Sequence, residues 1–356
     1  MSPVVREEPS AWGTRLRTAV VAGHLDDLPF VQQPAWAASK ALTGWESMRL
    51  VAGDAAEWVG AQLLIRRLPA GLGRIAYAPR GPIVAAPNAA RAEALRSEFL
   101  RGLAALRNDG VTMVRLEPGE SAPLPDDADQ VDPDDALSEA LRAPWFRAAA
   151  ESRIALHRAR PVQPSTSRRI DLTVGAESVR AGWRSKWRQY ARHAVESGVT
   201  VRADGADGAE PLHVAMSSIA GRTGVKTRSS AAFARIVGAF DGDAEILVAE
   251  SAAGETLGAL LVIDTATTTT ELFGGATDAG NELRAPYALK VAAIERAVAH
   301  GSMVYDMWGI STPGIAHFKA GWGGSPVVYP GALDLDLDPL RGPLVRLALR
   351  LRGFGA

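Results

Sequence analysis

Alternating apolar and polar positions predict two similar groups of strands, one in each half of the chain. Residues 50–65 (LVAGDAAEWVGAQLLI) and 247–263 (LVAESAAGETLGALLVI) each predict two strands joined by a short turn. A third strand is expected after each pair, from Arg74 to Tyr77 in the first group and from Thr269 to Phe273 in the second. Matching positions are about 190 to 198 residues apart, which indicates an internal repeat.

Each group of strands is followed by the same further elements. A helix is predicted over about 88–108 and over 285–299, and each ends at a glycine, Gly110 or Gly301, because a left-handed residue commonly ends a helix. A short apolar strand then follows in each half. Short matches such as LVA can arise by chance in an alanine-rich chain, but the shared order of elements favours duplication. The expected fold class is α/β (α+β), with two lobes that are each a mixed sheet flanked by helices.

Two irregular segments are expected between the lobes. Residues 117–135 contain several prolines and a run of aspartates, which is typical of a solvated loop. Residues 160–169 (RPVQPSTSRR) predict an interlobe linker, and the strand RIDLTV is expected to open the second lobe.

A basic helix is predicted over residues 180–197. Its core-facing stripe has helical spacing and consists of Trp183, Trp187, Tyr190 and Ala194. The other faces carry only basic charges: Arg180, Arg184, Lys186, Arg188 and Arg192. This pattern fits either an ordinary amphipathic helix with a basic outside or a surface that binds the phosphates of a substrate or an RNA. The absence of neighbouring acids favours the second interpretation slightly.

Composition changes this picture mainly by exclusion. The chain has 356 residues and a formal net charge of -1, so a protein coated in positive charge is excluded, although a local basic patch is not. The absence of cysteine excludes disulfides, cysteine-ligated metals and cysteine nucleophiles. The six histidines show no ligand spacing, and no metal is expected. Neither a signal peptide nor an apolar run of about 18 residues is visible, so a cytoplasmic protein is expected.

Two tight segments are candidates for chemistry. In residues 77–82 (YAPRGP), prolines and a glycine fix the backbone around Tyr77 and Arg80 at a strand end. In residues 318–324 (FKAGWGG), Lys319 lies among aromatics and glycines that allow a close approach. The second segment follows a strand that contains Asp306, and open α/β sheets place ligands at strand ends. The alternatives are a proline-rich turn with a surface arginine and a glycine-rich loop with a solvated lysine.

Several segments, in their order and spacing, resemble the Fem family of peptidoglycan-bridge aminoacyltransferases. The resemblance extends from about residue 10 to about residue 335. The segments are FVQQ at 30–33 with Trp36 and Lys40, YAPRGP at 77–82, GRTGV at 221–225 with Arg228, Tyr287, Tyr305-Asp306 with Gly309, and FKAGWGG at 318–324. Trp322 departs from the aromatics that are usual at its position, which puts the shape of the acceptor pocket in question.

The resemblance implies two lobes of the GNAT acyltransferase type, without a long helical arm. The first lobe would span 1–165 and be completed by 332–356, and the second would span 166–331. The leucines at 344, 347 and 351 predict a C-terminal amphipathic helix, which by resemblance returns to the first lobe; its arginines could instead contact anionic lipid. The implied reaction joins an amino acid from aminoacyl-tRNA to the stem peptide of lipid II or UDP-MurNAc-pentapeptide. The resemblance implies no cofactor or metal. It does imply peripheral contact with the inner membrane face.

The family's functional positions suggest roles for individual residues. Lys319 is the catalytic candidate, because aminolysis of an activated ester needs fixed positive charge for the oxyanion and the leaving oxygen. Lys40 and either Arg222 or Arg228 match the positions that hold the acceptor's diphosphate. The other substrate-binding candidates are Tyr77, Arg80, Tyr287 and Asp306, and the tRNA-binding candidates are Arg184, Lys186 and Arg188.

Two rival interpretations remain at this stage. The first is a GNAT-type N-acyltransferase that uses acyl-CoA, but residues 274–280 (GGATDAG) lack the leading Arg or Gln of the usual pyrophosphate-binding loop. The second is a binding-only relative that has lost activity, which the joint presence of Lys40, Arg80 and Lys319 disfavours.

Overall fold

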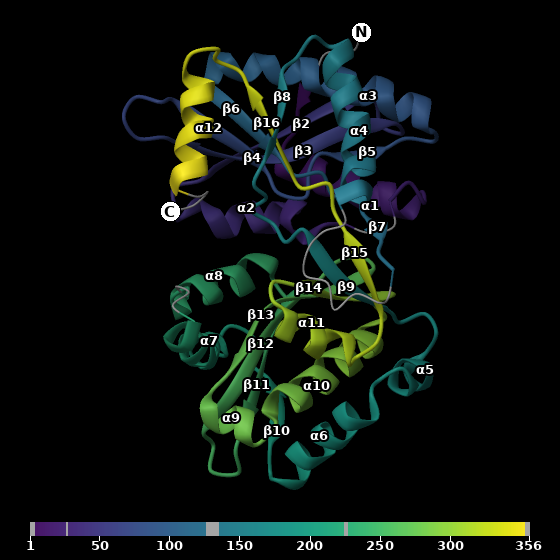
Figure 1. The fold of residues 1–356 in the computed structure, drawn as a ribbon, viewed down its shortest axis with the longest axis vertical. Helices are drawn as coiled ribbons and strands as arrows, with labels where there is room; N and C mark the ends of the chain where they lie inside the picture. Colours follow the sequence, from purple (N-terminus) through teal and green to yellow (C-terminus); the bar gives the residue numbers. More distant parts are fainter. Residues whose placement is uncertain (1–3, 26–27, 126–134, 224–226, 353–356) are drawn as a thin grey trace. The chain divides into compact units, whose positions relative to one another are not determined.

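The computed structural model describes residues 4–25, 28–125, 135–223 and 227–352, apart from the side chains of Asp135, Ala220, Arg222, Thr223 and Arg352. These residues divide into two compact units. The first contains residues up to 124, residues 135–166 and residues from 327 onward, and the second contains residues 167–326. The C-terminal part of the chain thus belongs to the same unit as the N-terminal part (Figure 1).

The first unit is built around one mixed sheet. Its strands are β1 (Val5–Arg6), β2 (Glu46–Gly53), β3 (Trp58–Arg67), β4 (Arg74–Ala78), β5 (Ile83–Ala85), β6 (Val111–Leu116), β8 (Leu156–Ala159) and β16 (Ala332–Asp336), and β7 (Ala122–Pro123) pairs separately with β15 (Ser325–Val328). Its helices are α1 (Pro9–Val21), η1 (Phe30–Gln32), α2 (Pro34–Ala41), α3 (Ala89–Leu103), η2 (Ala104–Asp109), α4 (Asp135–Glu151) and α12 (Arg341–Arg352). The strand order is β1-β2-β3-β4-β6-β16-β8, and β5 pairs with β3. Only the β4–β6 pair is parallel among these described strands.

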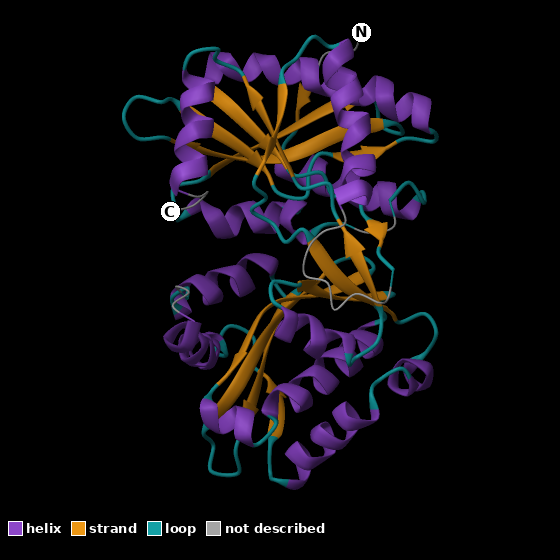
Figure 2. Ribbon diagram, viewed as in Figure 1, coloured by secondary structure: helices purple, strands orange, loops and turns teal. Residues whose placement is uncertain are grey.

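Helices cover both faces of this sheet, as Figure 2 shows. Successive side chains of a strand point to opposite faces, so neighbouring residues join different clusters. Leu50, Ala76 and Val114 pack with α3 and α4 on one face. Val51 packs with α1 on the other face, where Met113 packs with α12.

The second unit repeats this plan. Its strands are β9 (Thr166–Asp171), β10 (Thr200–Ala203), β11 (Ala244–Glu250), β12 (Thr256–Asp264), β13 (Thr268–Ala276) and β14 (Val304–Gly309). Its helices are α5 (Ala176–Ala181), α6 (Ser185–Glu196), α7 (Ala209–Thr223), α8 (Ser230–Phe240), α9 (Asp278–Glu282), α10 (Ala285–His300) and α11 (Pro313–Ala320). The strand order is β10-β11-β12-β13-β14-β9, with β13 and β14 parallel.

The predicted repeat is confirmed. In both units three antiparallel strands lead through a helix into a strand that pairs in parallel with the third. Gly110 (φ 74°) and Gly301 (φ 84°) both adopt the left-handed conformation expected of residues that end helices. In each unit one more strand pairs antiparallel with this parallel strand: β16 pairs with β6 in the first unit, and β9 pairs with β14 in the second.

The helical stretch expected over about 88–108 is confirmed, as α3 to Leu103 followed by the 3₁₀ helix η2 to Asp109. Two other local predictions were wrong. The segment 160–169 is not all linker, because β9 begins at Thr166 and pairs with β14. Residues 180–197 form two helices rather than one. They separate at Gly182 to Arg184, where the Arg184 amide donates to the Gly321 carbonyl at 2.8 Å.

The C-terminal segment is anchored to the first unit by a buried ion pair. Arg115 on β6 donates from Nε and Nη2 to the two carboxylate oxygens of Asp334 on β16, at 2.7 and 2.8 Å. α12 then packs through Val345 and Leu349 against Ile75 and Met113. The leucines of the sequence pattern lie on the opposite face of the helix and are exposed.

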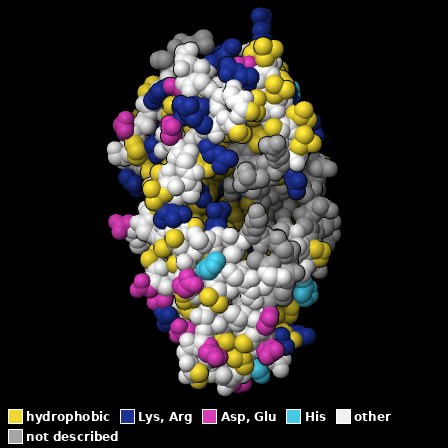
Figure 3. Space-filling model, turned by 90° about the vertical axis from the view of Figure 1, so that its left-hand side faces the viewer, with side chains coloured by type: hydrophobic (Ala, Val, Ile, Leu, Met, Phe, Trp, Pro, Cys, Tyr) yellow, Lys and Arg dark blue, Asp and Glu magenta, His cyan; other side chains and the backbone are white. Residues whose placement is uncertain are grey.

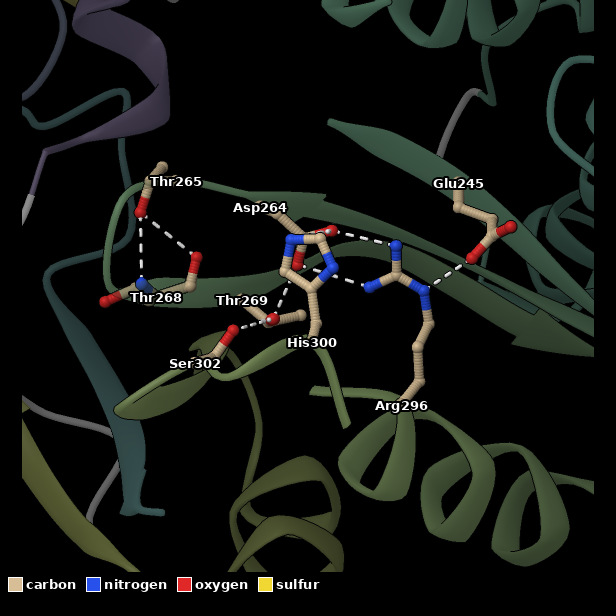
Figure 4. A network of polar contacts seen from close by, with 8 residues as sticks. All are labelled: Glu245, Asp264, Thr265, Thr268, Thr269, Arg296, His300 and Ser302. Atoms are coloured by element: carbon tan, nitrogen blue, oxygen red, sulfur yellow. Dashed lines mark hydrogen bonds and ion pairs between the residues drawn. The ribbon is translucent and has the colours of Figure 1, made fainter. Parts of the chain in front are cut away.

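A polar network in the second unit holds α10 against the sheet (Figure 4). Arg296 donates to both carboxylate oxygens of buried Asp264, at 2.8 and 3.2 Å, and to Glu245 at 2.5 Å. Thr269 donates to Asp264 at 2.6 Å and contacts Ser302 at 2.7 Å. Arg296 thus ties α10 to both β11 and β12.

Candidate active site

A cavity of about 670 Å³ lies in the second unit, lined by α6, α11 and the start of α10. Its lining combines cations and rings: Arg184, Ser185, Lys186, Trp187, Tyr190, Arg284, Tyr287 and His317. None of these residues is acidic. The structure therefore brings together three of the predicted site residues, Arg184, Lys186 and Tyr287.

Edge-to-face aromatic contacts build the wall of the cavity. Tyr287 packs at 5.6 Å from Trp187 and at 5.0 Å from Tyr190, measured between ring centroids. Gly321 allows the Trp187 ring to sit at this depth, since a Cβ there would lie 2.3 Å from the indole. The glycine-rich segment at this point therefore accommodates a neighbouring side chain.

The cations of the cavity lie over this aromatic wall. The guanidinium of Arg284 is 4.6 Å from the centroid of Tyr190, and the ammonium of Lys186 is 5.5 Å from the same ring. Arg184 lies 5.6 Å from the Trp187 ring and approaches Nδ1 of His317 at 3.3 Å. Positive charges beside aromatic rings in a cavity suit a ligand that carries both phosphates and planar bases.

The remaining arginines of the basic stretch are used differently. Arg188 donates from Nη1 to the carbonyls of Arg180, Ala181 and Trp183, at 3.3, 3.3 and 2.8 Å, so it satisfies the end of α5. Arg180 pairs with Glu295 at 2.7 Å. The stretch is therefore partly matched by acid, contrary to the sequence-based expectation, and Arg188 lies outside the cavity lining.

Lys319 on α11 is almost fully buried and is not part of the cavity lining. Its Nζ donates to the carbonyls of Met307, Trp308 and Gly309 at 2.5, 3.3 and 2.7 Å, where β14 ends. Burial lowers the pKa of Lys319 to about 8. Glu271, a smaller influence, acts in the opposite direction. Two of the three hydrogen bonds are short and the one to Trp308 is long, so one N–H donor is only weakly engaged.

A buried group of ionisable residues lies beside Lys319. Glu271 on β13 pairs with Lys290 on α10 and accepts a hydrogen bond from the Tyr305 hydroxyl at 3.0 Å. Burial, followed by the charge of Glu271, raises the pKa of Tyr305 well above its ordinary value. The sequence analysis missed Glu271 and Lys290. A lysine on the apolar face of the helix at 285–299 was the available signal.

Asp306 is fully engaged in structural contacts. It accepts hydrogen bonds from Ser167, from Arg169 Nε at 3.0 Å and from the Trp308 amide at 2.7 Å. Trp308 has a positive φ of 57°, a strained conformation for a residue with a side chain, so Asp306 stabilises the turn that presents carbonyls to Lys319.

In the first unit, Tyr77 and Arg80 lie in a buried network. The Tyr77 hydroxyl donates to Glu117 at 2.8 Å and accepts from Gln163 Nε2 at 2.8 Å, and burial raises the pKa of both Tyr77 and Glu117. Arg80 donates to the Pro164 carbonyl at 2.7 Å and lies 3.3 Å from the Tyr329 ring centroid. These contacts hold the segment around residue 163 against the strand end.

The FVQQ segment supports the YAPRGP turn. Gln32 is fully buried and donates to the Pro79 carbonyl at 2.7 Å. A Cβ at Gly81 would lie 2.7 Å from the Gln32 amide nitrogen, so glycine is required there. Gln32 thus fixes the turn that carries Arg80.

The diphosphate-binding candidates are spread over both units. Lys40, near the end of α2, places its ammonium 3.9 Å from the centroid of the Trp36 ring. Arg228 is exposed between α7 and α8, and its guanidinium lies 5.3 Å from the Phe273 ring centroid. The Arg222 side chain lies outside the described residues, so the choice between Arg222 and Arg228 stays open.

Two units of the same strand order, each with a parallel pair beside its helix, define a tandem GNAT-like protein. A model of the FemAB family matches residues 24–255 and 251–350. The chain therefore belongs to the FemAB family, whose members are aminoacyltransferases, and is an enzyme of that type. A sequence search of curated proteins gave no significant match.

Solved structures agree in fold. The crystal structure of FemX is 16% identical, covers 99% of this chain and 100% of its own, and gives a TM-score of 0.74. A tandem GNAT protein from the clavulanic acid biosynthesis pathway is 14% identical, with coverages of 94% and 98% and a TM-score of 0.54. The C-terminal domain of a putative lysylphosphatidylglycerol synthetase from Agrobacterium fabrum is 12% identical, with coverages of 98% and 100% and a TM-score of 0.53. At these identities the similarity concerns the fold alone.

The described helices also bear on membrane insertion. Within residues 4–25, 28–125, 135–223 and 227–352, no helix combines the length and the apolarity that a membrane crossing needs.

Proposed function

We propose that this chain transfers an aminoacyl group from aminoacyl-tRNA to an amine of the stem peptide of a peptidoglycan precursor. The observation that carries the proposal is the cavity of the second unit, where Arg184, Lys186 and Arg284 lie over aromatic rings without an acidic residue in the lining. Proteins bind single-stranded RNA ends by stacking bases on aromatic rings and by pairing phosphates with cations. FemAB family membership supports the same assignment.

The reaction needs orientation and charge rather than a nucleophilic side chain. The acceptor amine attacks the ester carbonyl, a C–N bond forms, the ester C–O bond breaks, and the ribose oxygen leaves with a proton that the amine has lost. Lys319 supplies the positive charge, by turning the N–H donor that now points to Trp308 O at 3.3 Å toward the developing oxyanion. Asp306, Tyr77 and Arg80 act as positioning residues, because their polar contacts shape the backbone on which the site is built.

The acceptor is bound through its phosphates and its peptide. Lys40 and either Arg222 or Arg228 hold the diphosphate, and Tyr287 contributes to the substrate-binding wall. The acceptor is lipid II or UDP-MurNAc-pentapeptide, the enzyme works in the cytoplasm with peripheral contact to the inner membrane face, and aminoacyl-tRNA is a co-substrate, so no cofactor takes part.

The alternative is an N-acyltransferase that uses acyl-CoA, and one observation disfavours it. In such enzymes backbone amides at a helix start bind the pyrophosphate. Here the Gly280 amide already donates to Thr277 Oγ1 at 3.0 Å, and a Cβ at Gly280 would lie 1.8 Å from the Leu257 carbonyl oxygen. The segment from the end of β13 to Gly280 is therefore packed against its own sheet.

Mass spectrometry tests the proposal directly. The enzyme is incubated with UDP-MurNAc-pentapeptide or lipid II and with a mixture of charged tRNAs, and parallel reactions contain acetyl-CoA instead. A mass increase equal to one aminoacyl residue, dependent on tRNA and lost on ribonuclease treatment, supports the proposal and identifies the amino acid. An acetyl mass increase without tRNA would establish the alternative.

A further inference from the structure

The C-terminal helix α12 has a second apolar face that no described part of the chain covers. Leu340, Leu344, Leu347 and Leu351 are exposed by 79%, 54%, 54% and 78%. At 100° per residue the three leucines within α12, at 344, 347 and 351, fall within an arc of about 60°, and Leu340 directly precedes the helix. Val345 and Leu349 lie on the other side of the helix and pack on the first unit. A contiguous row of exposed leucines is unusual on a soluble surface and marks an interaction site.

The helix that carries the leucine row is basic. Residues 339–352 contain arginines but no acidic residue. Arg341 and Arg346 form ion pairs with Asp338 and Asp336, whereas Arg350 is exposed and has no acidic partner in the described part of the chain. Among the charged side chains that Figure 3 shows on the first unit, Lys and Arg are more frequent than Asp and Glu.

We propose that α12 docks on an anionic phospholipid surface. The leucine row enters the boundary between headgroups and acyl chains, and Arg350 contacts lipid phosphates. A second copy of this chain suits the row poorly, because it would bring two arginine-bearing helices together without an acidic residue between 339 and 352. The docking deepens the membrane contact of the proposed function by naming the element that makes it. It does not depend on the identity of donor or acceptor, and it would hold the enzyme where a lipid-linked acceptor resides.

Vesicle co-sedimentation tests the docking. The full chain is mixed with vesicles of phosphatidylglycerol and phosphatidylcholine, and separately with vesicles of phosphatidylcholine alone. The triple variant Leu344→Ser/Leu347→Ser/Leu351→Ser removes the row without touching a buried residue. The matched control, Val21→Ser/Leu42→Ser/Val195→Ser, removes three side chains that are exposed by 89%, 80% and 65% elsewhere on the surface.

The native chain and the control are expected to bind the anionic vesicles. The row variant should bind at least about tenfold more weakly, because each replaced leucine no longer contributes the free energy of transfer from water into the lipid. Arg350→Glu should weaken binding to anionic vesicles and leave any residual binding to phosphatidylcholine unchanged. Absence of native binding, or equal binding by the row variant, would overturn the proposal. So would sedimentation velocity showing that the row variant converts a dimer to a monomer.

Transfer to soluble UDP-MurNAc-pentapeptide separates this proposal from the proposed function. The row variant should retain that transfer while it loses vesicle binding. If neither native chain nor variant transfers an amino acid, the proposed function fails, and the vesicle result still stands on its own.

Discussion

The protonation of Lys319 should set the alkaline limit of the reaction. With a pKa of about 8, about 90% of Lys319 is charged at pH 7 and about 10% at pH 9. If the ammonium stabilises the oxyanion, kcat/KM should therefore fall about tenfold over this range. Deprotonation of the acceptor amine at high pH would raise the rate. A decline in kcat/KM therefore reports a group on the enzyme.

Variants of Lys319 separate charge from geometry. Lys319→Met should lower kcat by about 10²–10³, the usual cost of removing one oxyanion-stabilising group. Lys319→Arg should restore part of the rate, and its pH–rate profile should not fall near pH 8, because a guanidinium stays charged. Glu271→Gln should move the limb of the native enzyme to lower pH, because the charge of Glu271 raises the pKa of Lys319.

The assay is single-turnover transfer from aminoacyl-tRNA to saturating acceptor between pH 6.5 and 9.5, corrected at each pH for ester hydrolysis without enzyme. Near-normal kcat in Lys319→Met, or the same alkaline limb in Lys319→Arg, would refute the role of Lys319. In that event its three carbonyl contacts would be purely structural.

The same pKa shift has a stability consequence with a defined sign. The pKa of Lys319 is lower in the folded chain than its ordinary value of 10.5, so the unfolded state binds more protons between pH 8 and pH 10.5. Below pH 8 the buried charge costs about 3 kcal/mol, and the cost disappears as the pH rises to 10.5. Urea unfolding of the native chain, relative to Lys319→Met, should show this rise, and a constant difference would contradict it.

Three further predictions concern binding and stability. Arg184→Glu should raise the donor KM and leave the acceptor KM unchanged. Arg192→Glu makes the same charge change on α6, outside the cavity lining, and should alter neither KM; equal effects of the two variants would mean that only overall charge matters. Lys40→Met should raise the acceptor KM with little effect on kcat, and the reverse pattern in steady-state kinetics would exclude diphosphate binding. Arg115→Met should lower the free energy of unfolding by about 3–5 kcal/mol, because Asp334 would stay buried without a partner; a loss below about 1 kcal/mol in urea unfolding would show that β16 is held mainly by other contacts.

The amino-acid sequence determined the repeated architecture. Apolar alternation over 50–65 and 247–263 follows the period of a strand, and glycines at 110 and 301 end helices through local backbone energetics. Such signals depend only on residues that are close in the chain, so they predict local structure without knowledge of which distant elements pack together. The YAPRGP and FKAGWGG segments indicated the family for the same reason, since their spacing is itself a local property.

Tertiary structure decided which side chains are available for chemistry. Arg184 and Arg188 are indistinguishable in the sequence, yet one lines the cavity and the other satisfies the end of α5. Lys290 and Glu271 are separated along the chain and become a buried pair only when α10 packs on β13. Hydrogen-bond partners of this kind depend on the packing of distant elements, which the local pattern does not encode.

The C-terminal helix shows both contributions in one element. Its sequence contains leucines at helical spacing and also Val345 and Leu349 on the opposite side, so the helix itself is predictable. The sequence does not predict which apolar face of the helix is buried, because the two faces have the same period and similar hydrophobicity. The sheet of the first unit decides this by offering Ile75 and Met113 to Val345, and the leucine row is left at the surface because an α-helix cannot turn both faces toward one sheet.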